Sequence, residues 1–255
     1  MKGALLLVLS ACMLAACNTT TGGGGDNIRP SSTTNEAAAT NLRLAVEYMQ
    51  RHEYERALEK LDRARQMDPG YALTYNTYGV LYQTLGDNLR AEQNFKRALQ
   101  LGGDDSATMN NYGRFLCQQN RLEEADAVFR KAASNPLYET REIPLANAGI
   151  CMLGAKRIPE AEKYFRSALE INPRMSTALV QMARLSFEQD DALRARGYLQ
   201  RYLEVGKPTA ESLWLGIQIE EKLGDRDAVA SYSMMLRNNF PDSEQAQKLR
   251  PAGTR

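Results

Sequence analysis

Apolar residues recur along most of the chain in a fixed pattern of four and then three residues. In five segments an alanine is followed four positions later by leucine or phenylalanine, and three positions after that by alanine or tyrosine. This spacing places the three side chains on one face of an α-helix. The segments return about every 34 residues, so the pattern predicts a repeated amphipathic helix. The triplets are Ala57/Leu61/Ala64, Ala91/Phe95/Ala98, Ala125/Phe129/Ala132, Ala161/Phe165/Ala168 and Ala195/Leu199/Tyr202.

A second apolar pattern lies between these segments and predicts a partner helix in each repeat. It contains one small residue at a constant position, which we expect where the two helices of a pair cross too closely for a larger side chain. The matching sets are Tyr75/Tyr78/Gly79/Tyr82, Met109/Tyr112/Gly113/Leu116 and Leu145/Ala148/Gly149/Met152, with Ala45 and Ala183 at the small position of the first and fifth repeats.

These offsets resemble the tetratricopeptide repeat, a helix pair with small and aromatic residues at fixed positions. The resemblance implies an all-α solenoid, a right-handed superhelix of about six helix pairs whose concave face is lined mainly by the first helix of each pair. The expected solenoid spans residues 41–244, followed by a C-terminal tail at 245–255. The repeats are placed at about 38–71, 72–105, 106–141, 142–175, 176–208 and 209–242.

Two repeats depart from the regular length. The third is longer by two residues around Asn135 to Tyr138. In the sixth, Gly216 and Tyr232 fit one register, whereas Gly224 and Pro241 fit a register one residue later. A small insertion of this kind is expected in a terminal repeat.

The N-terminal residues are typical of the leader of an exported lipoprotein, and we do not expect them to belong to the helical repeats. Residues 1–16 place Lys2 before an apolar run that is too short to span a membrane and has the length of a signal-peptide core. Leu14-Ala15-Ala16-Cys17 resembles the bacterial lipobox, which implies cleavage before Cys17 and acylation of its thiol by chains such as palmitate. Asn18, in place of an aspartate, implies sorting to the outer membrane. This lipid is the only non-protein group that we expect.

Residues 17–40 read as the lipidated cysteine and a flexible linker. Gly, Ser, Thr and Asn dominate the stretch, which cannot bury enough apolar surface to offset the entropy of ordering. A flexible chain of this length spans about 25–29 Å on average. The linker would therefore leave the solenoid facing the periplasm at some distance from the membrane.

Composition and charge exclude several classes of function. With 32 basic and 31 acidic residues, the chain has no basic excess for nucleic acid. A single histidine, His52, argues against a catalytic triad or a multi-histidine metal site, and its place in the turn of the first repeat indicates a solvated side chain. No phosphate-binding loop is recognisable either, because the glycines 22–25 follow no strand. The sequence predicts no enzyme, no metal site and no small-molecule substrate.

Cys117 and Cys151 remain after the leader is removed. Both fall on the first helices of adjacent repeats, in an oxidising compartment where a disulfide can form. Because disulfide geometry is demanding, two buried thiols are favoured over a bridge, which stays open as the alternative. A catalytic cysteine is disfavoured, since no second histidine accompanies it.

The expected partner-binding groove follows the first helices. Side-chain amides there can bond the backbone of an extended peptide, and Arg114 or Arg184 can take a carboxylate. In the first repeat an apolar stripe either forms an interface or packs inward. The candidate groove residues are Leu42, Val46, Met49, Leu73, Asn76, Val80, Asn110, Asn111, Arg114 and Asn147, with Thr77 and Gln181 nearby.

Three longer stretches carry a more specific resemblance. Residues 109–138, 147–173 and 213–243, together with the lipobox, closely resemble the type IV pilus biogenesis lipoproteins of the PilF/PilW type. The resemblance implies a pilotin, an outer-membrane lipoprotein that binds the secretin subunit of the pilus machinery. It would travel by the lipoprotein sorting machinery and promote secretin multimerisation, pilus biogenesis and twitching motility. The alternative is an adaptor for a periplasmic hydrolase or for an outer-membrane protein assembly machine.

Overall fold

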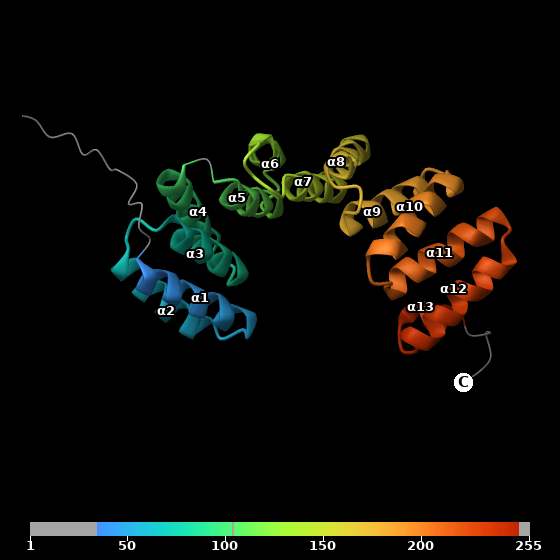
Figure 1. The fold of residues 1–255 in the computed structure, drawn as a ribbon, viewed down its shortest axis with the longest axis horizontal. Helices are drawn as coiled ribbons and strands as arrows, with labels where there is room; N and C mark the ends of the chain where they lie inside the picture. The colour runs from blue at the N-terminus through green and yellow to red at the C-terminus, as the bar shows by residue number, and fades with distance from the viewer. Residues whose placement is uncertain (1–34, 104, 250–255) are drawn as a thin grey trace, which may run out of the picture. The chain divides into compact units, whose positions relative to one another are not determined.

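The computed structural model describes residues 35–103 and 105–249 and forms thirteen helices within them. The first twelve make six consecutive pairs, and each pair packs on the next in chain order (Figure 1). The expected all-α solenoid of helix pairs is confirmed. The helices are α1 (Glu36–Gln50), α2 (Tyr54–Met67), α3 (Ala72–Thr84), α4 (Asn88–Gly102), α5 (Ser106–Gln118), α6 (Leu122–Ser134), α7 (Glu142–Gly154), α8 (Ile158–Ile171), α9 (Ser176–Glu188), α10 (Ala192–Val205), α11 (Ala210–Leu223), α12 (Arg226–Asn239) and α13 (Glu244–Lys248).

The core consists of the residues that carry the repeated pattern. Phe95, Phe129 and Phe165, from the second helices α4, α6 and α8, are fully buried. Each packs against the glycine of its partner helix. A Cβ atom built on Gly113 would lie 2.7 Å from Cε1 of Phe129, which explains why this position must stay small.

The turn between the two helices of each pair also repeats. In all six pairs its central residue has a positive φ, and the next residue donates its backbone N–H to the carbonyl five positions earlier, at 2.8–3.0 Å. This left-handed C-cap satisfies carbonyls that the helix end would leave without a partner. The six central residues are His52, Gly86, Asn120, Lys156, Asp190 and Gly224; His52 is exposed, as expected.

Both registers expected for the sixth repeat are present. Gly216 faces Tyr232, to which an added Cβ would come within 3.1 Å, while Gly224 occupies the turn. Both registers fit because α11, with 14 residues, is one residue longer than α9, the first helix of the preceding repeat, which has 13. The longer third repeat is also present, as the connection 135–141 between α6 and α7, where Leu137 is 88% exposed.

The solenoid begins earlier than expected. Residues 36–40, which we assigned to the linker, form the first turns of α1, and Ala38 is fully buried. The Asn35 side chain caps the helix by accepting from the Ala37 N–H at 3.0 Å, and it donates to the carbonyl of Met67 at 3.1 Å. The signal peptide 1–16, Cys17 and the linker up to residue 34 lie outside the described residues.

The prediction of a C-terminal tail at 245–255 is also partly wrong. Residues 244–248 form α13, which packs on α11 and α12 and buries Ala246 beside Leu213 and Leu236. This short helix covers apolar surface of the last helix pair, as a terminal cap does in a solenoid. Residues 250–255 of the expected tail lie outside the described part.

Candidate peptide-binding face

The first helices of the six pairs place one side chain at the same position in every repeat. Each lies six residues before the positive-φ turn residue, and none is fully buried. We call these six residues the first-helix face. They are Val46, Val80, Arg114, Ile150, Arg184 and Gln218, on α1, α3, α5, α7, α9 and α11.

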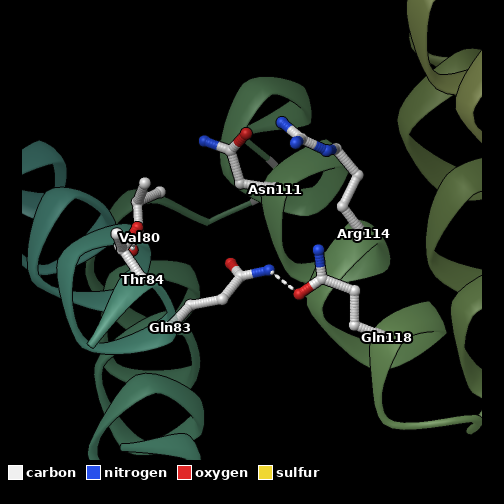
Figure 2. Close-up of a pocket in the computed structure, with 6 residues that line it drawn as sticks. All are labelled: Val80, Gln83, Thr84, Asn111, Arg114 and Gln118. Atoms are coloured by element: carbon white, nitrogen blue, oxygen red, sulfur yellow. Dashed lines mark hydrogen bonds between the residues drawn. The ribbon is translucent and has the colours of Figure 1, made fainter. Parts of the chain in front are cut away.

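Two hollows adjoin in the middle of this face. The α3–α5 hollow has a volume of about 360 Å³ and is lined by Val80, Gln83, Thr84, Asn111, Arg114 and Gln118 (Figure 2). The α5–α7 hollow, of about 280 Å³, is lined by Arg114, Cys117, Gln118, Phe129, Asn147, Ile150 and Cys151. Because both are lined by Arg114 and Gln118, the two hollows adjoin at these side chains, and we call them together the depression across α3, α5 and α7.

Arg114 is the centre of positive charge in this depression. Its side chain is exposed, and no carboxylate of the described residues pairs with it. The helices α3, α5 and α7 contain one other charged residue, Glu142, whose Oε1 accepts from Asn172 Nδ2 at 3.3 Å. Arg114 therefore retains its five donors for a ligand.

Amide side chains connect successive first helices across the face. Asn111 Nδ2 donates to Asn76 Oδ1 at 3.2 Å, and Asn147 Nδ2 donates to Asn110 Oδ1 at 2.8 Å. Gln83 and Gln118 make a third bond of this kind (Figure 2). Each amide has two donors and an acceptor, so a single bond leaves further capacity for a peptide backbone.

The structure sorts the ten predicted groove residues into exposed and buried sets. Val46 and Leu73 are about two-fifths exposed, at 39% and 41%, and Val80 lines a hollow. Leu42 and Asn110 are buried at 8% exposure, so their assignment to an open groove was wrong. Leu42 belongs to the core of the first repeat, against which Met49 also packs.

Some lining residues were missed by the sequence analysis. Gln83, Thr84 and Gln118 lie one or two helical turns beyond predicted positions, and Ile150 is the counterpart of Arg114 one repeat later. The signal was available, because residues four and seven positions apart share a helix face.

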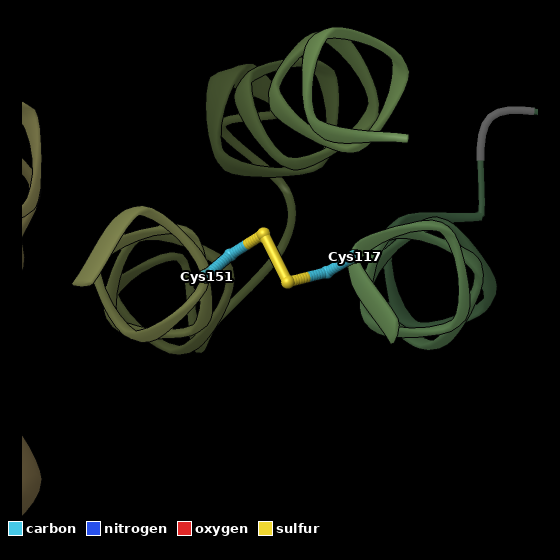
Figure 3. Close-up of a disulfide and its surroundings, with 2 residues drawn as sticks. All are labelled: Cys117 and Cys151. Atoms are coloured by element: carbon cyan, nitrogen blue, oxygen red, sulfur yellow. A yellow bond between two sulfur atoms is a disulfide. The ribbon is translucent and has the colours of Figure 1, made fainter. Parts of the chain in front are cut away.

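A disulfide joins Cys117 of α5 to Cys151 of α7 at the edge of the α5–α7 hollow (Figure 3). The preference for two separate thiols was therefore wrong. The Cα atoms are 5.8 Å apart, within the usual range for a disulfide. The repeat period had placed the residues on neighbouring helices, but their separation depends on how closely the two repeats stack.

A separate ionic cluster joins α4 to the end of the α5–α6 turn. Glu92 Oε1 accepts from Lys96 Nζ at 2.8 Å, Arg121 Nη1 at 2.8 Å and the Tyr112 hydroxyl at 3.2 Å. Hydrogen bonds from Lys96 and Arg121 lower the pKa of Glu92 to about 2. Burial and the negative charge of Glu92 raise the pKa of Tyr112 to about 12. Each of the three donor side chains bonds to a carboxylate of the chain, so the cluster serves packing between repeats.

The described residues also bear on metal and membrane sites. No group of three or more His, Cys, Asp or Glu side chains there could hold a metal ion. None of the helices in the described ranges is both long and apolar enough to cross a bilayer.

Comparison with known proteins identifies relatives of the whole repeat array. The tetratricopeptide repeat family profile matches residues 77–139. The chain is 31% identical over 214 residues to the type IV pilus assembly protein PilF of Pseudomonas aeruginosa, covering 84% of this chain and 85% of the relative. A solved structure of that PilF matches with a TM-score of 0.72 and 31% identity, over 84% of this chain and 96% of the other.

A second solved structure, PilW, described as a widely conserved type IV pilus biogenesis factor, matches with a TM-score of 0.71 and 33% identity. It covers 84% of this chain and 99% of PilW. Identity above 30% over almost the whole of both relatives, with the same stack of helix pairs, goes beyond a generic repeat match. The chain therefore belongs to the PilF/PilW family of type IV pilus biogenesis proteins built from tetratricopeptide repeats.

Proposed function

We propose that this chain acts as a pilotin, which binds the secretin subunit of the type IV pilus machinery and brings it to the outer membrane. The observation that carries the proposal is an open first-helix face, with polar and apolar groups that have no internal cover, in a member of a pilus biogenesis family. Tetratricopeptide solenoids present such faces to extended segments of other proteins. The role requires no catalytic step.

The proposed membrane attachment rests on the lipobox at Cys17, which lies outside the described residues. Two or more acyl chains anchor a protein stably, whereas one gives reversible binding. Sorting of the lipidated chain would carry the bound secretin to the outer membrane facing the periplasm. Tethering raises the local concentration of secretin subunits there and favours assembly of the secretin multimer.

The test is the substitution Cys17→Ser in cells, with Cys12→Ser as a matched control. The control removes a cysteine from the same leader but leaves the lipobox intact. We expect Cys17→Ser to deplete secretin multimers from the outer membrane and to reduce surface pili, while Cys12→Ser behaves as wild type. Normal outer-membrane secretin multimers in the Cys17→Ser strain would refute delivery.

Deletion of the whole chain separates the pilotin from the adaptor. Loss of pili and secretin multimers with a normal envelope supports the pilotin. Septation defects or a general loss of outer-membrane proteins, with pili retained, would contradict it and favour the adaptor.

A further inference from the structure

Arg114 occupies the junction of the two hollows and differs chemically from its counterparts on either side. The equivalent residues one repeat before and one repeat after are Val80 and Ile150, and both line the same depression. Ile150 is 44% exposed. The middle of the first-helix face therefore presents a sequence of apolar, cationic and apolar groups from α3 to α7.

The cation in this sequence lacks a counter-charge. Arg114 has no carboxylate partner among the described residues, and α3 and α5 contain no acidic residue. A guanidinium without a partner is complementary to a carboxylate, which it binds through two parallel hydrogen bonds. The hollows continue on both sides of Arg114, so a bound chain can extend in both directions, as an internal acidic residue requires and a chain terminus does not.

The repeat spacing sets the spacing expected in a partner. Packed helices lie about 8–10 Å apart. A chain in the extended polyproline II conformation advances about 3.1 Å per residue with three residues per turn, so side chains three residues apart lie on the same side. One repeat therefore corresponds to roughly three residues of an extended ligand. The amides of Asn111, Gln118 and Asn147 line the path and can bond its backbone.

We propose that the depression across α3, α5 and α7 binds an extended protein segment in which one Asp or Glu side chain contacts Arg114 and apolar side chains three residues to either side contact Val80 and Ile150. The inference deepens the proposed function, on which it rests, by naming the chemistry of the segment that a delivered protein must contain.

Arg184 provides an internal control. It occupies the position of Arg114 on α9 and is also exposed, but its hollow of about 400 Å³ is lined by two acidic residues, Glu188 and Glu211. These negative charges oppose an incoming carboxylate. Replacement of Arg184 is expected to matter much less for an acidic segment.

The test uses two synthetic peptides with blocked ends and a fluorescent label. The first is Ser-Leu-Ser-Asn-Glu-Ser-Asn-Leu-Ser, and the second has Gln in place of Glu. Their binding to the full-length chain in detergent is measured by fluorescence anisotropy for the wild type and the variants Arg114→Gln, Arg114→Lys and Arg184→Gln. Circular dichroism checks that these surface substitutions leave the helices intact.

We expect the wild type to bind the Glu peptide about tenfold more tightly than the Gln peptide, as for one charge-assisted pair. Arg114→Gln should abolish this preference, Arg114→Lys should retain part of it, and Arg184→Gln should leave it unchanged. Equal affinity for the two peptides, no binding of either, or an equal loss in Arg184→Gln would overturn the proposal. Delivery of the secretin, tested separately through Cys17→Ser in cells, would still stand.

Discussion

Substitution of Gly113 by alanine tests whether close crossing within a helix pair holds each repeat together. The added Cβ would lie 2.7 Å from Cε1 and 2.8 Å from Cδ1 of Phe129. These separations are about 1 Å shorter than ordinary carbon contacts. Phe129 is fully buried in the core, so relief of this overlap requires its ring to shift from its packed position.

Two effects of opposite sign determine how much Gly113→Ala changes the free energy of unfolding. Alanine is favoured over glycine inside a helix by about 1 kcal/mol. Overpacking of a well-filled core costs about 1–3 kcal/mol, and the fully buried ring at Gly113 places the cost in the upper part of that range. We therefore expect Gly113→Ala to lower the free energy of unfolding by about 1–2 kcal/mol.

Gly197→Ala is the matched control. Gly197 also lies inside a helix, α10, but a Cβ there would meet no atom within 4 Å. The control isolates the backbone effect and should raise the free energy of unfolding by about 0.5–1 kcal/mol. Urea unfolding followed by far-ultraviolet circular dichroism measures both, with the slope m checked for each variant.

A second-site change at Phe129 sharpens the test. Phe129→Leu alone should destabilise the protein, but it should cost less in the Gly113→Ala background because the smaller side chain relieves the overlap. If Gly113→Ala were as stable as the wild type, or if Gly113→Ala and Gly197→Ala changed stability by the same amount, the close-crossing argument would be refuted.

Three further predictions concern covalent, ionic and backbone contributions to stability. Replacing both Cys117 and Cys151 by serine should cost about 3–4 kcal/mol in urea unfolding for a bridge that spans 34 residues, and reductant should have the same effect on the wild type but none on the variant. Glu92→Gln should lower the free energy of unfolding by about 1–2 kcal/mol at pH 7, after allowance for solvent screening. The pKa of Glu92 is about 2 in the folded chain and is usually 4.5. The stability difference between the wild type and Glu92→Gln should therefore be complete above pH 4.5 and should disappear as the pH falls towards 2. A stability difference that stayed constant across that range would contradict the ionic cluster. Lys156→Gly should stabilise the chain by about 0.5–1 kcal/mol and Gly86→Ala should destabilise it by a similar amount, since both residues have a positive φ; thermal unfolding that shifted in the same direction for both would argue against the left-handed turn.

The repeat architecture could be predicted from the sequence because its signal is one-dimensional. Each second helix contributes residues four and three positions apart to one face, and Phe95, Phe129 and Phe165 are buried as this pattern predicts. The small residue of each first helix was also correctly interpreted. The close crossing of two helices leaves no room for a side chain at one position of the first helix, and glycine occupies this position at Gly79 and Gly113.

The ends of the solenoid could not be predicted in the same way. The alanine-rich start of α1 lacks large apolar residues, so Ala38 gave no sign that it would be buried. At the other end, α13 is too short to show a helical period, and it is stable only because it covers the last pair. Both segments owe their structure to neighbours rather than to their own pattern.

By itself, the sequence determined the number of helix pairs, the residues of their shared core and the chemical kind of each side chain on the first-helix face. These properties depend on spacing along one helix and on contacts within one repeat. Only the tertiary structure decided that Leu42 and Asn110 are buried, that Asn76 and Asn147 bond to the neighbouring repeat, and that Cys117 reaches Cys151. It also decided that Arg114 has no partner among the described residues. The reason is that contacts between repeats depend on the angle and distance at which successive pairs stack, and a periodic sequence repeats its residues without recording that geometry.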